Sequence, residues 1–314
     1  MTAGIAFGLI VVLAPTAAAA DDSSQPTAPE TEPQGTVGAQ APATTGTTEV
    51  DGSGKFAKAA TVDDATATDA TEFNLGAGGL LSTGNARAGS ITGATNLRIR
   101  REKHQFSAAF AANYGRAAPD AASDVQTTVH NEQGRVRYDY FVHPRISLFA
   151  MLTARHDPFQ GLEARVNVDP GVAFYLVNDK RNRLWTEVGY DFQFDRFTEV
   201  ATYAKDEAGA VVLDDQGDPI VAIDRQRMNH AVRLFGGYAN NISAAAMFST
   251  GFEYLQSVEI AERWRINWDV ALTSQLVNRL AISFTFTARM DNDPAPGIKK
   301  VDTITAVSLI CTIF

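Results

Sequence analysis

The sequence predicts an all-β fold: a transmembrane barrel of about twelve antiparallel strands preceded by a disordered periplasmic segment. Three observations predict it. Apolar and polar residues alternate along about twelve segments between residue 71 and the end of the chain. The links between these segments alternate between a short and a longer class. No apolar run beyond the N-terminal region reaches the roughly 20 residues that a membrane-spanning helix needs.

The N-terminal region predicts export. Residues 1–20 contain an apolar run at 5–13 and end in Ala18, Ala19 and Ala20, as expected of a signal peptide, although no basic residue precedes the run. Residues 21–70 are rich in Ala, Thr, Pro, Gly and acids and predict a disordered periplasmic linker. The barrel is therefore expected at residues 71–314.

The segment 262–272, ERWRINWDVAL, shows the alternation most clearly. Trp264 and Trp268 lie on one parity, and Arg263, Arg265 and Asp269 lie on the other. Successive side chains of a strand point to opposite faces, so one face is aromatic and the other charged. A soluble β-sandwich would have to bury these charges or expose the tryptophans on strand after strand, and both are costly. In a membrane barrel the tryptophans face lipid and the charges face inward.

The same alternation recurs in order along the chain. The clearest examples are 105–114, 135–140, 145–153, 165–174, 184–195, 248–254 and 280–289. The last segment, 301–314, is apolar on both parities, so its facing is not set by the pattern. It ends in Phe314, which resembles the terminal aromatic residue that outer-membrane barrels present to the insertion machinery.

The links predict the orientation of the barrel. The short class comprises 101–103, 142–144, 178–182, 240–243 and 277–278. The longer class comprises 83–85, 115–125, 156–162, 196–227, 257–259 and 290–300. Outer-membrane barrels have short periplasmic turns and long surface loops, so both chain ends are expected in the periplasm.

Several stretches resemble the salt-induced outer membrane protein family, a family of predicted barrels without an established activity. They are 82–85 (STGN), 137–141 (RYDYF), the spaced residues Asp157, Phe159, Gln160, Leu162 and Arg165, and a glycine-bearing strand at 171–176. The resemblance covers most of residues 73–314. It implies a barrel in the outer membrane and supplies no catalytic residues.

The inward parity predicts a charged lumen. Its candidate selectivity residues are Arg98, Arg100, Arg135, Arg137, Asp139, Arg165, Glu187, Asp191, Arg263, Arg265 and Asp269. The same parity also holds Arg155, Asp169, Arg233, Glu253 and Arg289. These residues either line a narrow pore that favours anionic solutes or pair across the interior and fill it. Twelve strands lie between the filled eight-stranded barrels and the open porins, so both interpretations remain.

Outward residues predict contacts with the membrane. Tyr138, Tyr140, Trp264 and Trp268 are expected in the aromatic girdles at the membrane interfaces. The loop 196–227 is acidic and is expected to be a solvated surface loop next to outer-membrane lipid and lipopolysaccharide. Its acids lack the spacing of a calcium-binding loop.

Catalysis and nucleic-acid binding are not predicted. A lipid hydrolase needs a serine beside a histidine, and neither His130 nor His230 has a serine expected at its level. The net charge of −9 argues against a nucleic-acid partner, and the lone cysteine, Cys311, provides no metal site. No cofactor or metal is expected.

The sequence thus predicts a non-catalytic outer-membrane barrel, either a narrow charged pore for small solutes or a protein of the response to osmotic or salt stress. One alternative is a structural barrel with a filled lumen, anchored through its linker to a periplasmic partner. The second is an outer-membrane lipid hydrolase.

Overall fold

A computed structural model describes residues 69–82, 87–118, 124–179, 181–206, 209–243, 245–277 and 280–312. For much of β1 and β12 this description covers the backbone alone. The expected signal peptide, most of the linker and Phe314 lie outside the described residues. Across the described ranges, none of the helices has the length and apolar character needed to cross a membrane.

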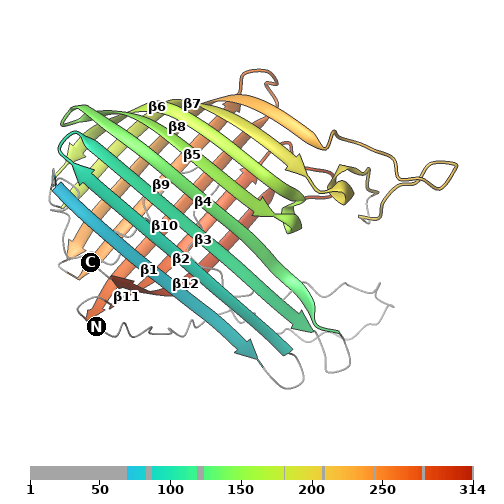
Figure 1. The fold of residues 1–314 in the computed structure, drawn as a ribbon, viewed down its shortest axis with the longest axis horizontal. Coiled ribbons are helices and arrows are strands. Elements are labelled where there is room, and N and C mark those ends of the chain that lie inside the picture. Colours follow the sequence, from blue (N-terminus) through green and yellow to red (C-terminus); the bar gives the residue numbers. More distant parts are fainter. Residues whose placement is uncertain are drawn as a thin grey trace, which may run out of the picture.

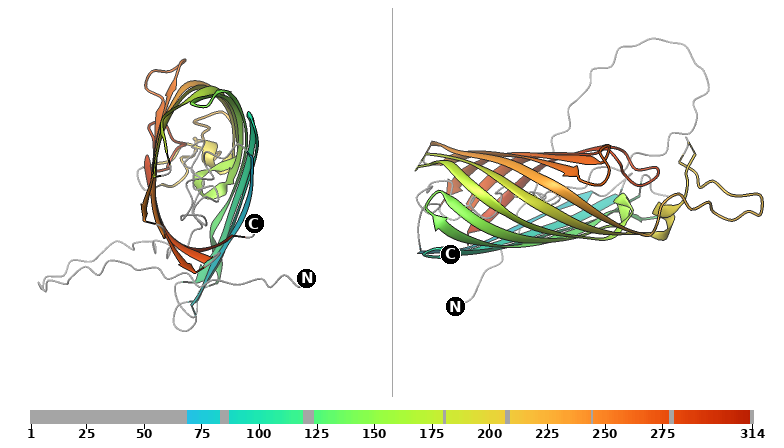
Figure 2. Two further views of the ribbon diagram at one scale, coloured as in Figure 1. Left: turned by 90° about the vertical axis from the view of Figure 1, so that its left-hand side faces the viewer. Right: turned by 90° about the horizontal axis from the view of Figure 1, so that it is seen from above.

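The chain forms a closed barrel of twelve strands, each hydrogen-bonded to its neighbours in sequence, with β1 pairing β12. Figure 1 shows the tilted strands and Figure 2 the closed ring. All pairs are antiparallel, as predicted. The strands are β1 (Asp69–Ser82), β2 (Arg87–Arg101), β3 (His104–Ala118), β4 (Gln126–His143), β5 (Ile146–Asp157), β6 (Leu162–Asn178), β7 (Asn182–Phe197), β8 (Gln226–Ser243), β9 (Ala246–Ser257), β10 (Trp264–Val277), β11 (Leu280–Asp291) and β12 (Val301–Thr312).

The two ends of the barrel differ in their connections. One, the turn end, carries the links after β2, β4, β6, β8 and β10. The other, the loop end, carries the short 3-10 helices η2 (Pro158–Gln160) and η3 (Glu199–Thr202) and the longer links. Because the strands alternate in direction and are even in number, β1 begins and β12 finishes at the turn end.

Several predicted boundaries are wrong: residues 115–118 belong to β3, and the predicted turn 240–243 belongs to β8. The link between β9 and β10 covers 258–263 rather than 257–259, so Arg263 belongs to a loop and precedes the strand in which it was expected. The backbone of that link is turned back by hydrogen bonds such as Arg263 N–H to the carbonyl of Ile260. The barrel also begins earlier than predicted, because Asp69 already pairs with Arg101.

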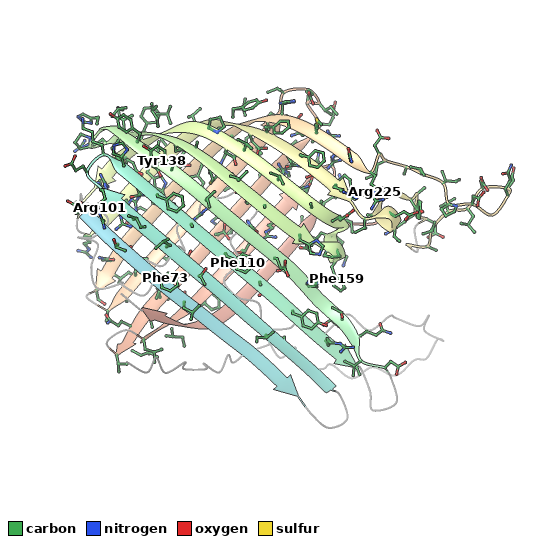
Figure 3. The ribbon with its side chains drawn as sticks, in the orientation of Figure 1. Phe73, Arg101, Phe110, Tyr138, Phe159 and Arg225 are labelled. Atoms are coloured by element: carbon green, nitrogen blue, oxygen red, sulfur yellow. The ribbon has the colours of Figure 1, made fainter. Side chains whose placement is uncertain are left out.

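The faces of the strands follow the predicted parity. Trp268 is 43% exposed on the outside, whereas its neighbour Asp269 is 5% exposed and points inward. Phe110 and Tyr138, labelled in Figure 3, belong to the same outer surface of exposed apolar side chains. A closed barrel with an apolar exterior and a polar interior satisfies its backbone within the sheet and meets the condition for spanning a bilayer. The fold is a transmembrane β-barrel.

An apolar cluster lies inside the barrel toward the turn end. It consists of Phe141, Phe149, Met151, Ala173, Tyr175, Trp185 and Phe235. Guanidinium groups lie over its rings, with Arg100 3.9 Å from the centre of Phe141 and Arg137 4.0 Å from that of Phe149. The lumen was predicted as charged throughout, so this aromatic layer was missed. Its signal was the run 146–152, which is apolar on both parities apart from Ser147.

Inward glycines make room for these rings. A Cβ atom on Gly171 would lie 2.5 Å from Phe149 Cζ, and one on Gly237 would lie 2.3 Å from Trp185 Cζ2. Both rings therefore lie against bare backbone of the barrel wall. The residue before Gly237, Gly236, faces outward, and its Cβ would have no atom within 4 Å.

The bulky inward side chains come mainly from one side of the barrel. Strands β4 to β9 contribute the aromatic cluster and most buried arginines and carboxylates. On β10 and β11 near the turn end, the inward residues are small: Ala271, Thr273, Ala281 and Ser283. In the strand order, β10 and β11 lie opposite β4 and β5. Large inward side chains on one wall therefore lie opposite small ones on the other.

The link between β7 and β8 forms an arm that extends beyond the loop end (Figures 1 and 2). Three backbone hydrogen bonds close it into a ring, from Ala204 N to Ile220 O, from Val212 N to Ala204 O and from Ile220 N to Val212 O. Its tip turns at Asp214, whose carboxylate accepts the backbone N–H groups of Asp218 and Gln216. These bonds hold the pKa of Asp214 below its usual value. The arm is the predicted acidic surface loop.

Substituting Gly237 with alanine tests the close packing of Trp185. The new methyl group overlaps the indole ring, so we expect a loss of about 1–3 kcal/mol in the free energy of unfolding. Urea unfolding of the barrel in lipid vesicles measures it. The matched control Gly236→Ala, on the outer face, should change stability by less than about 0.5 kcal/mol. If both variants changed the free energy of unfolding equally, the close packing of Trp185 against Gly237 would be contradicted.

Candidate functional site

A continuous belt of ion pairs crosses the middle of the lumen. Arg137 donates to both oxygens of Asp139 at 2.9 and 2.8 Å and to Glu187 at 3.0 Å. The other oxygen of Glu187 accepts from Arg233 at 2.8 Å, and Arg233 also donates to Glu253 at 2.6 Å. The belt thereby links β4, β7, β8 and β9 through side chains alone.

The belt is fully buried. The side chains of Arg233 and Glu253 are 0% exposed, and those of Arg137, Asp139 and Glu187 are at most 2% exposed. Charges removed from water this completely are tolerated only when they are paired and hydrogen-bonded. The five charged side chains of the belt thus fill the lumen at their level.

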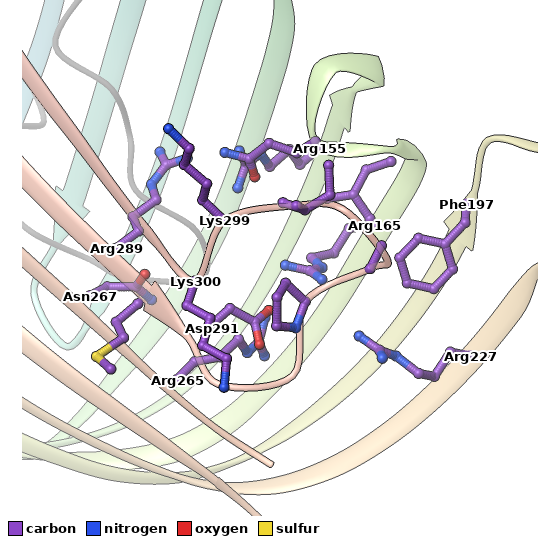
Figure 4. A pocket seen from close by; sticks show the side chains of 16 residues that line it. Arg155, Arg165, Phe197, Arg227, Arg265, Asn267, Arg289, Asp291, Lys299 and Lys300 are labelled. Atoms are coloured by element: carbon purple, nitrogen blue, oxygen red, sulfur yellow. The ribbon is translucent and has the colours of Figure 1, made fainter. Parts of the chain in front are cut away.

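Above the belt, at the loop end, lies a vestibule with a volume of about 620 Å³, including space open to solvent. Figure 4 shows the basic side chains that converge on it from the wall and from the β11–β12 loop. Its basic lining residues are Arg155, Arg165, Arg227, Arg265, Arg289, Lys299 and Lys300, and its acidic lining residue is Asp291. The charged side chains in its lining are therefore mainly basic.

Strand ends position these arginines, and nearby carboxylates hold some of them. Arg165 makes two bonds to Asp195, at 2.6 and 2.8 Å. Arg155 bonds Asp157 at 2.7 Å. Arg265 lies 3.6 Å from Asp191, beyond hydrogen-bond distance. Its buried Nη2 therefore keeps donor capacity, since it has no hydrogen-bond partner in the described part of the chain.

The β11–β12 loop, 292–300, folds into the mouth of the vestibule. Ala295 is buried against Leu162, Phe197 and Ala201 of the opposite rim, and Ile298 packs beside them. The carboxylate of Asp293 accepts from Arg263 at 2.8 Å and from Arg227 at 3.3 Å. Apolar contact and ion pairing together hold the loop in place.

The structure places the predicted lumen residues on the inner side of the barrel. Buried inward positions hold Arg98, Arg100, Arg135, Arg137, Asp139, Arg165, Glu187, Asp191 and Asp269, and a half-buried one holds Arg265. The exception is Arg263, which is half-buried in the loop before β10. The predicted lumen residues do not form one site. Arg137, Asp139 and Glu187 belong to the belt, whereas Arg165 and Arg265 line the vestibule. Arg98 instead pairs with Glu72 near the turn end.

Four contributors to the site were not predicted from the sequence. Arg227, Lys299 and Lys300 line the vestibule, yet they were assigned to surface loops. Asp293 was likewise treated as part of a loop. The clustering of Lys299 and Lys300 beside Arg289 was the available signal, but nothing in the local pattern indicates that the loop turns inward.

The predicted interface aromatics lie on the outer face. Tyr138 bonds His104 at 2.6 Å near the turn end, and Tyr140 packs beside the same histidine. Trp268 is exposed and donates to Thr250. Trp264 is half-buried at the loop end of β10. Tyr138, Tyr140 and Trp268 are thus exposed, and the place of these aromatics at the membrane interfaces stays a prediction.

The histidines considered for hydrolysis have other partners. His130 lies 3.6 Å from Glu132 and stacks edge-on against His156. His230 contacts Tyr190 and lies 4.0 Å from Glu259. Within the described ranges neither histidine is hydrogen-bonded to a serine. The described residues also contain no group of three or more His, Cys, Asp or Glu that could hold a metal ion.

Residues 75–313 match a family described as "Protein of unknown function, DUF481". The chain belongs to this family. The match covers the whole barrel apart from the start of β1, and it confirms the resemblance to a family of barrels without an established activity. A comparison with curated proteins found no match.

Three solved structures are similar in outline. The NanC porin is 10% identical, with a TM-score of 0.44 over 78% of this chain and 100% of its own. The translocator domain of the autotransporter NalP from Neisseria meningitidis is 7% identical, with a TM-score of 0.38 over 78% and 87%. The CymD monoaromatic hydrocarbon channel is 10% identical, with a TM-score of 0.36 over 85% and 94%. Likenesses at this level carry no information on function.

Substituting Arg233 with glutamine tests the belt. Glu187 and Glu253 would each lose a buried charged partner, so we expect the free energy of unfolding to fall by about 3–5 kcal/mol. Urea unfolding in lipid vesicles measures the change. Arg101→Gln is the control, because its ion pair with Asp69 is exposed at 4.0 Å, and it should cost no more than about 1 kcal/mol. If Arg233→Gln lowered the free energy of unfolding no more than Arg101→Gln does, the belt would contribute little to stability.

Proposed function

We propose that the protein is a narrow outer-membrane channel that admits small anionic solutes through its cationic vestibule. The observation that carries the proposal is the lining of that vestibule, where seven basic side chains face a single acidic one, Asp291. A cleft lined by one sign of charge concentrates counter-ions and speeds their entry. The loop end is the entrance in this proposal.

The outer membrane is the proposed location. The apolar outer face, the aromatic residues near both ends and the short turns at one end are those of bacterial outer-membrane barrels. The loop end with its arm then faces the cell exterior and lipopolysaccharide, and the turn end faces the periplasm. Export by a signal peptide and insertion through Phe314 belong to the same proposal.

The belt sets the size of the proposed solutes. Below the vestibule, a solute meets Arg137, Glu187 and Arg233, whose charges are already paired. A small anion can pass only where these pairs exchange partners or leave room beside the small residues of β10 and β11. The proposal is therefore for slow passage of small solutes.

A barrel with a filled lumen is the second candidate, and the burial of the belt favours it. Arg233 and Glu253 are out of contact with water in this structure. A filled barrel would serve as an envelope protein, in a structural role or in the response to osmotic stress. The partners of His130 and His230 support no hydrolase.

Currents through the purified barrel in a planar bilayer test the proposal. We expect small discrete steps with an anion preference read from the reversal potential in a salt gradient. The double variant Arg265→Gln, Lys299→Gln should lower that preference, because each charge within about 4 Å of an ion contributes about 1 kcal/mol in water. The expected loss is about fivefold for each charge.

Arg225→Gln is the matched control for this measurement. Arg225 lies at the base of the arm, where it pairs with Glu163 outside the vestibule lining. The substitution Arg225→Gln removes one positive charge from the same end of the barrel and should leave the anion preference unchanged. A correctly folded but silent barrel would favour the filled lumen, and currents without anion preference would remove the role of the vestibule.

A further inference from the structure

The Asp293 carboxylate lies between two arginines that come from different elements. Arg227 belongs to the start of β8 and Arg263 to the loop before β10, whereas Asp293 is on the β11–β12 loop. Both guanidinium groups donate to the same oxygen, Oδ2, at 3.3 and 2.8 Å. Two cations brought close together are stabilised by an anion between them, and here the loop supplies it. Arg227 also lies 3.6 Å from the buried carboxylate of Asp195.

The burial of the three groups is unequal. The side chains of Arg227 and Arg263 are each 17% exposed, whereas that of Asp293 is 46% exposed. The two guanidinium groups are therefore more enclosed than the carboxylate, which is open to solvent. A structural ion pair with a permanent anion is expected to bury the carboxylate as deeply as its partners. Here the carboxylate can be exchanged for another from solution.

The site is also incompletely satisfied by Asp293. Only one of its oxygens is used by the two arginines, and the buried Nε–H of Arg227 has no hydrogen-bond partner among the described residues. Guanidinium groups bind carboxylates best through two parallel bonds. A carboxylate free of the loop backbone can use both oxygens and reach the unused donor.

We propose that Arg227 and Arg263 form a binding site for a carboxylate solute, which Asp293 occupies in this structure and which an entering carboxylate takes over. Exchange removes one tie of the β11–β12 loop to the wall and frees the mouth of the vestibule. The loop retains its contacts at Ala295 and Ile298, so it loosens without unfolding the barrel. The inference rests on the proposed function in one respect, that the competing carboxylate is the transported solute.

Trypsin cleavage after Lys299 and Lys300 reports on the loop without any need for conduction. Both residues are exposed on the loop that Asp293 holds. The full barrel in lipid vesicles is digested in sodium chloride and in sodium acetate of equal ionic strength, and cleavage at these sites is followed by mass spectrometry. We expect acetate to speed cleavage about fivefold to tenfold, as expected for loss of a charge-assisted hydrogen bond.

Two variants separate the site from general charge effects. Asp293→Asn should be cleaved rapidly in chloride and should not respond further to acetate. Glu163→Gln removes one negative charge from the same end of the barrel, at a position outside the vestibule lining where the carboxylate pairs with Arg196 and Arg225. It should behave as the native protein does in both salts.

The outcomes divide clearly. Slow cleavage of Asp293→Asn, or an equally rapid cleavage of Glu163→Gln, would overturn the assignment. A response to inorganic phosphate with none to acetate would also overturn it, because the site would then not be one for carboxylates. If the barrel is silent in bilayers but acetate acts through Asp293, the channel fails and the binding site stands. If the barrel conducts anions but acetate does not change the cleavage of the loop, the channel stands and the carboxylate site fails.

Discussion

The pairing of charge inside a closed barrel is the constraint on which the rest of this structure depends. Once the strands close, every inward side chain leaves water at the level of the belt, and an unpaired ion there costs several kcal/mol. Arg233 meets this constraint through Glu187 and Glu253, which come from the two strands flanking β8. The register of β7, β8 and β9 and the pairing of their charges therefore reinforce each other.

The same constraint divides the lumen into levels. Near the turn end, rings such as Phe149 exclude water, and the guanidinium of Arg137 lies over this ring while its polar atoms reach the belt. Toward the loop end the interior opens to solvent, and arginines such as Arg265 can be left partly unsatisfied. Chemistry that needs access to solutes is therefore confined to the vestibule.

The fold and the facing of most residues could be predicted because alternation is a local property. Trp268 and Asp269 are neighbours in the chain, and their opposite environments follow from strand geometry alone. The partners of each arginine could not be predicted, because Arg137 and Glu187 are 50 positions apart and meet through tertiary structure. The inward fold of Asp293 was also hidden, since a loop has no periodicity that shows its direction.

The uneven distribution of bulk between the two walls has an evolutionary consequence. The lumen is filled by residues of β4 to β9, such as Trp185 and Arg233, while Ala271 and Ala281 on the opposite side contribute little. The bore can therefore be widened or narrowed by substitutions on one half of the barrel. The other half, which carries the closing contact of β1 with β12, can remain constant. The filling of the lumen can thus diverge while the strand pair that closes the barrel stays the same.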